Sequence, residues 1–327
     1  MHIDNARELK SRLLSGVVQA SSLERPTGIA SVGISVLPPG GAAAGPRYGL
    51  AVRYSGNRGE VLADSARELA ARTAGDEVDI REIGLVTALT APTEPGTWTP
   101  ETLQRKTRPL RPGLSIAQRD VTAGTLGGFV TVEGSDGLYV LSNNHVLANS
   151  DQAALEDPVL QPGPHDGGRA ADRVGRLARA VPLEAGGGNA VDAALALLED
   201  DVSEVDLEYP VGRLTGWTDP DDEIAVEKVG RTTGWTKGRV TAIELDDVAV
   251  QYPVGVVSFD GQIEVEGDAG AFSAGGDSGS LVYRPDTRQA VGLLFAGSER
   301  GGAGGAGLTF CNPIGLVLTA LGATLVV

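Results

Sequence analysis

The pattern of apolar and polar residues predicts one helix and then two strands at the start of the chain. Between residues 4 and 18, leucine and valine recur at the three- and four-residue spacing of an amphipathic helix. Continuous apolar runs then occupy residues 29–36 and 48–54, and proline and glycine cluster between them. Runs of this length, separated by turn residues, are typical of strands.

The following stretch completes a small α/β unit. Residues 64–74 combine alanine and leucine with good helix formers, after an aspartate that can cap a helix and before a glycine that can end it. Residues 79–86 then return to a strand. We therefore predict an N-terminal α/β domain over residues 1–90. Five prolines and a basic run mark residues 91–112 as a linker that lies along the surface.

Helical periodicity nearly disappears after residue 113. Short apolar runs between glycine-rich turns continue to the C-terminus, among them residues 127–132, 138–142, 238–243 and 290–295. Strands at this spacing, without helices between them, are typical of antiparallel barrels or sandwiches. Most of the chain is therefore expected to be β structure.

Composition and charge narrow the class of protein. The 327 residues carry 27 basic and 43 acidic side chains, a net charge of −16, which disfavours nucleic acid and anionic membrane surfaces as partners. No apolar run approaches the length that spans a bilayer, and the N-terminus lacks the pattern of a secretory signal. The single cysteine, Cys311, excludes an intrachain disulfide. A soluble, cytoplasmic protein is expected.

One glycine-rich stretch contains a candidate nucleophile. In residues 275–280 a serine, Ser278, lies among small residues just before an apolar strand. Backbone N–H groups can crowd around an oxyanion in such a stretch. A tight turn between two strands explains the same composition, so the stretch needs support from elsewhere in the chain.

Two upstream residues can supply the base and the acid that such a serine requires. His145 follows an apolar strand, whereas the other two histidines lie at the terminus and in a turn. Asp192 lies within an apolar run, where an unpaired charge would be costly to bury, so it needs a partner. In acyl transfer a histidine takes the proton of the attacking serine, and an aspartate fixes the histidine tautomer. His145, Asp192 and Ser278 can form such a set.

Other polar and reactive residues are better explained without chemistry. Lys228, Arg231 and Lys237 could bind an anion, but glycines among them favour a hairpin with solvated charges. Cys311 follows an apolar run and is expected to be a buried strand thiol rather than a second nucleophile. No zinc or calcium motif is present, and we expect neither a metal nor a cofactor.

The motifs around the candidate residues resemble the trypsin-like serine proteases. Leu-Ser-Asn-Asn-His-Val at 141–146 resembles the histidine motif of that family, especially of its HtrA branch, and Gly-Asp-Ser-Gly at 276–279 resembles its serine motif. Residues 122–130, 228–238 and 272–281 resemble disulfide-free intracellular members that include the plant narrow-leaf proteases. The resemblance covers the chain from about residue 113 to its end.

This resemblance implies a fold, a site and an activity. The fold is two six-stranded antiparallel β-barrels, the first over 113–210 with His145 and Asp192 and the second over 211–327 with Ser278. The backbone N–H groups of Gly276 and Ser278 would form an oxyanion hole. The implied function is that of a serine endopeptidase acting on a protein or peptide substrate.

The resemblance also places a substrate pocket, at Phe272 and at Phe295, Ala296 and Gly297. No acidic residue is evident there. Small or medium apolar side chains, rather than lysine or arginine, are therefore expected before the scissile bond.

A second interpretation stays open because of Asp277. In secreted relatives a freed N-terminus pairs with the aspartate before the serine, whereas here a whole domain precedes the barrels. Asp277 must therefore find another partner, or the oxyanion hole is unformed at rest. The alternative function is a trypsin-like fold that binds peptides or acts as a scaffold, with a silent or conditionally active site.

Overall fold

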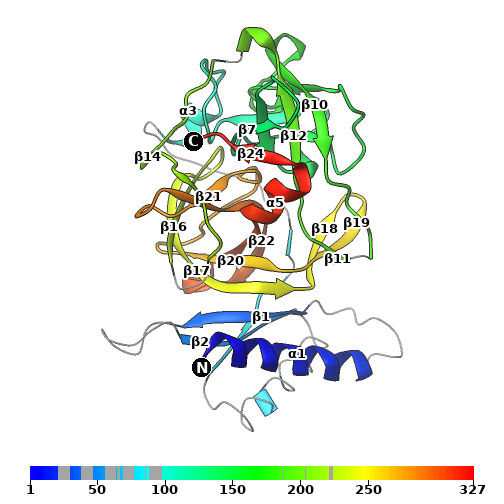
Figure 1. Ribbon diagram of the computed structural model, residues 1–327, viewed down its shortest axis with the longest axis vertical. Helices are drawn as coiled ribbons and strands as arrows, with labels where there is room; N and C mark the ends of the chain where they lie inside the picture. The colour runs from blue at the N-terminus through cyan, green and yellow to red at the C-terminus, as the bar shows by residue number, and fades with distance from the viewer. Residues whose placement is uncertain are drawn as a thin grey trace.

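The computed structural model shows a mainly β protein with few helices. The structure describes residues 1–20, 30–37, 47–55, 64, 67–68, 77–84, 86–87, 98–186, 188–202, 204–220 and 224–327. The expected fold class is confirmed, because the strands form one closed six-stranded barrel and one half-barrel (Figure 1). The expected helix over 64–74 lies largely outside the described residues. None of the helices in the described ranges is both long and apolar enough to cross a membrane.

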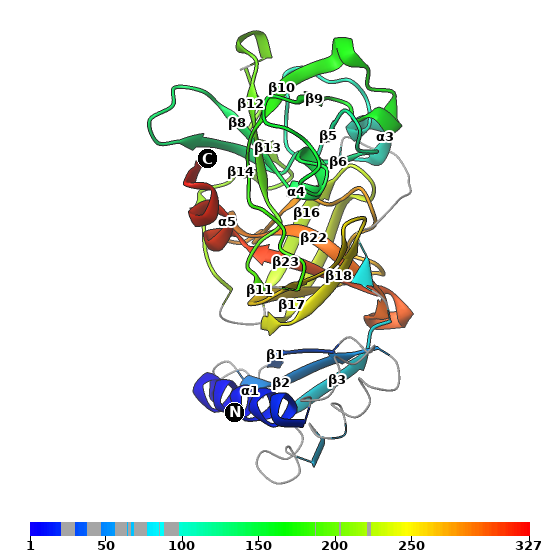
Figure 2. The same cartoon turned by 90° about the vertical axis from the view of Figure 1, so that its right-hand side faces the viewer.

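The N-terminal unit is a helix packed on a small sheet, as expected. Its elements are α1 (Ile3–Ala20), β1 (Ala30–Leu37), β2 (Arg47–Tyr54) and β3 (Val78–Glu82). β2 pairs antiparallel with β1 and parallel with β3. Leu13 of α1 shares a buried apolar cluster with Val32, Leu50 and Val52 of the sheet. Figure 2 shows α1 on the face of this sheet that is turned away from the barrels.

The C-terminal part of the chain contains the closed barrel. Its strands follow one another around the barrel in the order β16 (Ala225–Gly230), β17 (Gly234–Asp246), β20 (Gln262–Gly267), β23 (Gly307–Pro313), β22 (Gln289–Gly301) and β21 (Leu281–Tyr283). Every neighbouring pair is antiparallel, and β21 closes the ring onto β16. Valine, isoleucine and leucine from alternate positions fill the interior, among them Val226, Val240, Val265 and Leu294.

The middle of the chain forms the half-barrel. Its antiparallel sheet has the order β24 (Ala323–Leu325), β7 (Gly128–Val132), β8 (Tyr139–Ser142), β12 (Ala194–Leu198), β10 (Arg173–Ala180), β9 (Pro158–Leu160), β5 (Ser115–Gln118) and β6 (Gly124–Thr125). The expected six-stranded closure is not present as a continuous ladder. The chain bends between β6 and β7, where the N–H groups of Leu126 and Gly127 donate to Leu114 and Leu141 instead. The C-terminal strand β24 adds to the other edge after α5 (Ile314–Leu321).

Short elements connect these parts. Within the described residues they are β4 (Val86–Thr87), α3 (Pro100–Leu103), α4 (Asn144–Leu147), β11 (Gly188–Asn189), β13 (Glu208–Tyr209), β14 (Gly212–Arg213), β15 (Gly216–Trp217), β18 (Val248–Tyr252), β19 (Gly255–Phe259) and the 3-10 helices η1 (Pro164–Asp166), η2 (Ala170–Asp172), η3 (Asp200–Val202) and η4 (Ala303–Gly305). Part of the expected surface linker is packed rather than exposed. Leu103 and Leu110 are fully buried in the core of the half-barrel, because these two leucines face the apolar interior while the polar residues around them remain outside.

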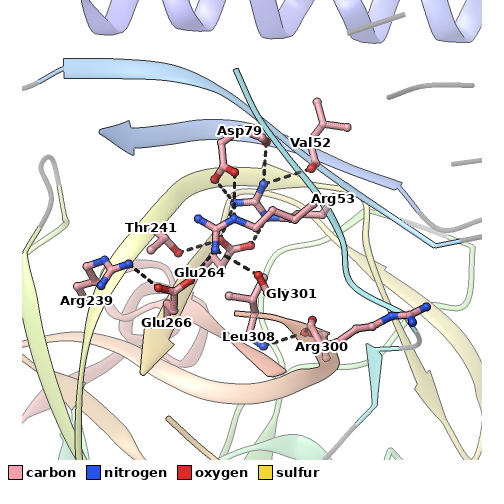
Figure 3. A network of polar contacts seen from close by, with 12 residues as sticks. Val52, Arg53, Asp79, Arg239, Thr241, Glu264, Glu266, Arg300, Gly301 and Leu308 are labelled. Carbon is pink, nitrogen blue, oxygen red and sulfur yellow. Dashed lines mark hydrogen bonds and ion pairs between the residues drawn. The ribbon is translucent and has the colours of Figure 1, made fainter. Parts of the chain in front are cut away.

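A continuous sheet joins the N-terminal unit to the closed barrel. β1 pairs antiparallel with β17, so β1, β2 and β3 extend the barrel sheet at one side. The fully buried Arg53 of β2 reaches Glu264 of β20, with 2.6 Å between Nε and Oε2 (Figure 3). The N-terminal unit is therefore bonded to the barrel through backbone and side chains.

Candidate active site

His145 and Asp192 are in direct contact. His145 lies in the one-turn helix α4 that follows β8, and Asp192 lies two residues before β12, which pairs with β8. The His145 Nδ1 lies 2.5 Å from Oδ2 of Asp192, and the His145 backbone N–H donates to Oδ1 at 3.2 Å. Asp192 is fully buried. The partner that the sequence required for this carboxylate is His145.

Tyr252 and Asn312 are among the further residues that hold Asp192, and neither was predicted from the sequence. The hydroxyl of Tyr252, at the end of β18, donates to Oδ2 at 2.6 Å. Asn312 of β23 accepts the Asp192 backbone N–H through Oδ1 at 3.0 Å. Burial, followed by the charge of Asp192, raises the pKa of Tyr252 well above its ordinary value. A buried tyrosine hydroxyl needs an acceptor, so a tyrosine at the end of an apolar strand is a signal for such a role, but a weak one.

Ser278 lies in the loop before β21, as expected, but its hydroxyl bonds to a backbone carbonyl rather than to His145. It is 2% exposed, and its hydroxyl donates to the carbonyl of Phe295 at 3.4 Å. No hydrogen bond joins Ser278 to His145 among the described residues. The structure therefore joins the candidate base to the acid, but it shows no bond between the candidate nucleophile and the base among the described residues.

The candidate oxyanion donors are the backbone N–H groups of Gly276 and Ser278. In the part of the chain that the structure describes, neither group donates a hydrogen bond, whereas the N–H groups of Asp277 and Gly279 bond to Ala274 at 3.0 Å and Leu294 at 2.8 Å. Gly276 has a φ of 86°, and a Cβ there would lie 2.6 Å from the hydroxyl oxygen of Thr232. Glycine is thus required at this position by both conformation and space.

Asp277 has the partner that the sequence left unidentified. Its carboxylate is fully buried and lies 3.4 Å from Nζ of Lys228. The backbone N–H groups of Thr232, Thr233 and Ala274 donate to it at 2.8, 3.1 and 3.0 Å, and the Thr233 hydroxyl donates at 2.6 Å. An internal lysine and the turn between β16 and β17 therefore hold the residue before Ser278.

This contact corrects one expectation about the hairpin charges. The hairpin itself is present as β16 and β17, but Lys228 is fully buried and Arg231 is 4% exposed. Arg231 pairs with Asp166 of η1, and only Lys237 extends outward, over the ring of Trp235. The charges are buried because a carboxylate from another segment compensates each of them, which no local pattern reveals.

The residues predicted to form the substrate pocket are all buried. The rings of Phe272 and Phe295 are fully buried in two separate core clusters, and Ala296 belongs to the same cluster as Phe295. Gly297 pairs with Thr87 of β4. The apolar substrate pocket stays a prediction. Cys311 is a buried thiol on β23, as expected, and burial raises its pKa.

β4 lies beside the candidate site and inserts between two strands. Thr87 pairs with Gly297 of β22 on one side and with Gln251 of β18 on the other. Gly297 is two residues beyond Phe295, whose carbonyl accepts from Ser278, and Gln251 precedes Tyr252. No group of three or more histidine, cysteine, aspartate or glutamate residues within the described ranges could hold a metal ion.

Comparison with known proteins gives fold neighbours only. No family model matches the chain, and no curated protein matches it. Among solved structures, Thermobifida fusca Protease A is 20% identical with a TM-score of 0.46, and the comparison covers 66% of this chain and 98% of that one. Nocardiopsis Protease is 20% identical with a TM-score of 0.48, and the comparison covers 67% of this chain and 99% of that one. A glutamic acid specific serine protease is 24% identical with a TM-score of 0.48, and the comparison covers 66% of this chain and 100% of that one. The narrower resemblance to HtrA and plant narrow-leaf proteases stays a prediction.

Proposed function

We propose that this protein is a serine endopeptidase that hydrolyses peptide bonds through an acyl-enzyme. The observation that carries the proposal is the fully buried carboxylate of Asp192 at 2.5 Å from Nδ1 of His145. A carboxylate on Nδ1 places the ring proton there and leaves Nε2 free to accept one. Ser278, in its glycine-rich loop, is the nucleophile that this base would serve.

The proposed reaction proceeds in two halves. The Ser278 hydroxyl rotates toward His145, and Nε2 takes its proton as Oγ bonds to the substrate carbonyl carbon, whose π electrons move to the oxygen. The tetrahedral intermediate then collapses, the C–N bond breaks, and His145 returns the proton to the leaving amine. Water repeats these steps on the acyl-enzyme and releases the new carboxyl end.

The loop around Ser278 supports stabilisation of the oxyanion. The N–H groups of Gly276 and Ser278 have no acceptor within the described residues, and such a charge requires backbone donors of this type. Asp277 lies between these two donors, and its buried ion pair with Lys228 anchors it. The donors would thus be organised before substrate binds.

Active-site labelling tests this proposal. A fluorophosphonate probe should label the intact protein, and mass spectrometry should locate the probe on Ser278. Ser278→Ala should abolish labelling, whereas Ser273→Ala, which changes a buried serine of the same loop that pairs with Thr309, should leave it. Labelling that persists in Ser278→Ala would refute the assignment.

The second candidate is a site of this kind that is active only under certain conditions. Extended peptides commonly bind by adding a strand to a sheet edge. Here β4 already pairs with β22 at Gly297 and Ser298, close to the candidate nucleophile. The orientation of the Ser278 hydroxyl favours the same interpretation. We propose that the chain's own β4 competes with substrate for this edge.

A further inference from the structure

The Asp192 carboxylate is held from both halves of the molecule. His145 contacts it through its ring Nδ1 and its backbone N–H, both from α4 in the half-barrel region. The third donor is the Tyr252 hydroxyl on β18, a strand of the other sheet. Within the described ranges no further side chain donates to this carboxylate, since Asn143 and Asn312 bond only to the backbone of Asp192.

The ring of Tyr252 also contacts the candidate base. Its centroid lies 5.7 Å from that of His145 at 61°, an edge-to-face arrangement. Tyr252 in turn packs on Phe259 at 6.1 Å, and Phe259 on Phe295 at 4.8 Å. This series of rings connects His145 to the residue whose carbonyl accepts the Ser278 hydroxyl.

We propose that Tyr252 is a positioning residue of the candidate active site, which fixes the Asp192 carboxylate with its hydroxyl and the plane of the His145 ring with its own ring. This inference rests on the proposed function. Tyr252 touches no reacting atom and acts only through Asp192 and His145. It differs from a core tyrosine in that its hydroxyl shares Oδ2 with the His145 ring nitrogen.

A buried tyrosine is suited to this task. Tyr252 is 3% exposed, and its raised pKa keeps the hydroxyl protonated, so that it remains a donor across the neutral range. The carboxylate oxygen that faces His145 is then fixed by two donors from different segments. Removal of the hydroxyl alone should let the carboxylate rotate and the His145 ring tilt.

Tyr252→Phe tests the role, because it removes the hydroxyl and retains the ring. The matched control is Tyr139→Phe, in which the lost hydroxyl pairs with that of Ser135 instead. In Tyr252→Phe we expect kcat for a peptide substrate to fall about tenfold with KM changed less than about twofold. The control should retain both constants.

A second readout does not depend on catalysis. In a Ser278→Ala background, proton NMR should show the downfield proton between His145 and Asp192, and its exchange with water should be faster in Tyr252→Phe than in Tyr139→Phe. Equal exchange rates in the two variants would overturn the inference, even if the intact protein cleaves no peptide. If the protein does label and cleave but both variants match it, the proposed function stands and the role of Tyr252 falls.

The unaltered side chain provides a measurement that needs no variant at position 252. The hydroxyl proton of Tyr252 should be protected from exchange and show a nuclear Overhauser effect to the His145 ring. A hydroxyl proton that exchanges freely would contradict the contact on which the inference rests.

Discussion

At the scale of single residues, Lys228 and Asp277 show how this fold holds the loop before the nucleophile without a freed N-terminus. Lys228 is fully buried, and its ammonium also bonds to the Thr233 hydroxyl and to the carbonyl of Gly234 at 3.1 Å. Burial lowers the pKa of Lys228, while the charge of Asp277 opposes that effect. A buried pair of this kind adds little stability overall, but loss of one partner leaves the other charge uncompensated.

Lys228→Met should therefore weaken both the fold and the candidate site. Without the ammonium, the Asp277 carboxylate loses its only counter-charge among the described residues, and the expected loss in free energy of unfolding is about 3 kcal/mol. Labelling of Ser278 by the fluorophosphonate should slow at least about tenfold. The control is Lys237→Met on the same hairpin, where the side chain is 57% exposed. Equal labelling rates in the two variants would show that Lys228 does not organise the loop.

The candidate triad residues could be proposed from the sequence at this scale, whereas the residues that support them could not. His145 and Ser278 lie in short motifs whose residue types reflect their own chemistry, and Asp192 is conspicuous as a charge in an apolar run. Tyr252 lies in no such motif, and the stretch 228–238 does not reveal the partner of Lys228. Their roles depend on contacts across 60 and 49 positions, since Tyr252 meets Asp192 and Lys228 meets Asp277. Only the paired sheets bring these positions together.

At the scale of elements, the strand expected over 79–86 is divided in two. β3 ends at Glu82, and Gly84 has a φ of 67°, a left-handed conformation that interrupts a strand. The chain therefore leaves β2 and resumes as β4 between β18 and β22. Strand propensity alone predicted the β residues but not the change of partner, because pairing depends on which edge is open.

Disruption of β4 should raise activity if this strand competes with substrate. Thr87→Pro removes a backbone donor and fixes φ at about −65°, which is poorly compatible with strand pairing. We expect kcat/KM for a short peptide substrate to increase several-fold, mainly through a lower KM. Thr87→Ala is the matched control, since it retains the backbone N–H and should behave like the unaltered protein. If both variants cleave at the unaltered rate, β4 does not occupy the substrate edge.

At the scale of the whole molecule, the N-terminal unit is part of the barrel's architecture rather than an appended domain. β1 continues the barrel sheet beyond β17. The guanidinium of Arg53 bonds to both oxygens of Glu264 at 2.6 and 2.7 Å and to Asp79 at 2.8 Å. Arg81 of β3 adds a bond to Glu266 of β20 at 2.6 Å. The sequence predicted two barrels and an α/β unit, but charges at 53 and 264 contain nothing that identifies them as partners.

The pKa values of this network follow from its geometry. Burial by itself would lower the pKa of Arg53, but Glu264 and Asp79 outweigh burial and raise it. Burial would likewise raise the pKa of Asp79, and the charge of Arg53 with the hydrogen bonds of Arg81 lowers it below its ordinary value instead. Arg53 and Asp79 therefore both remain charged at neutral pH, and the low pKa of Asp79 depends on the cations of Arg53 and Arg81 remaining in place.

Arg53→Met should show whether this network only stabilises the fold or also controls the candidate active site. The substitution leaves the fully buried Glu264 without its ion-pair partner, so we expect the free energy of unfolding to fall by about 3–5 kcal/mol in urea titrations. Arg7→Met is the control, because the pair of Arg7 and Glu244 is exposed and should contribute less than about 1 kcal/mol. At urea concentrations below the unfolding transition, fluorophosphonate labelling of Ser278 in Arg53→Met should rise rather than fall. The reason is that β4 is the next strand after β3, so a loosened N-terminal unit holds β4 less firmly against β22. A variant that is destabilised by this amount but labels at the unaltered rate would show that the N-terminal unit stabilises the barrel without controlling the site.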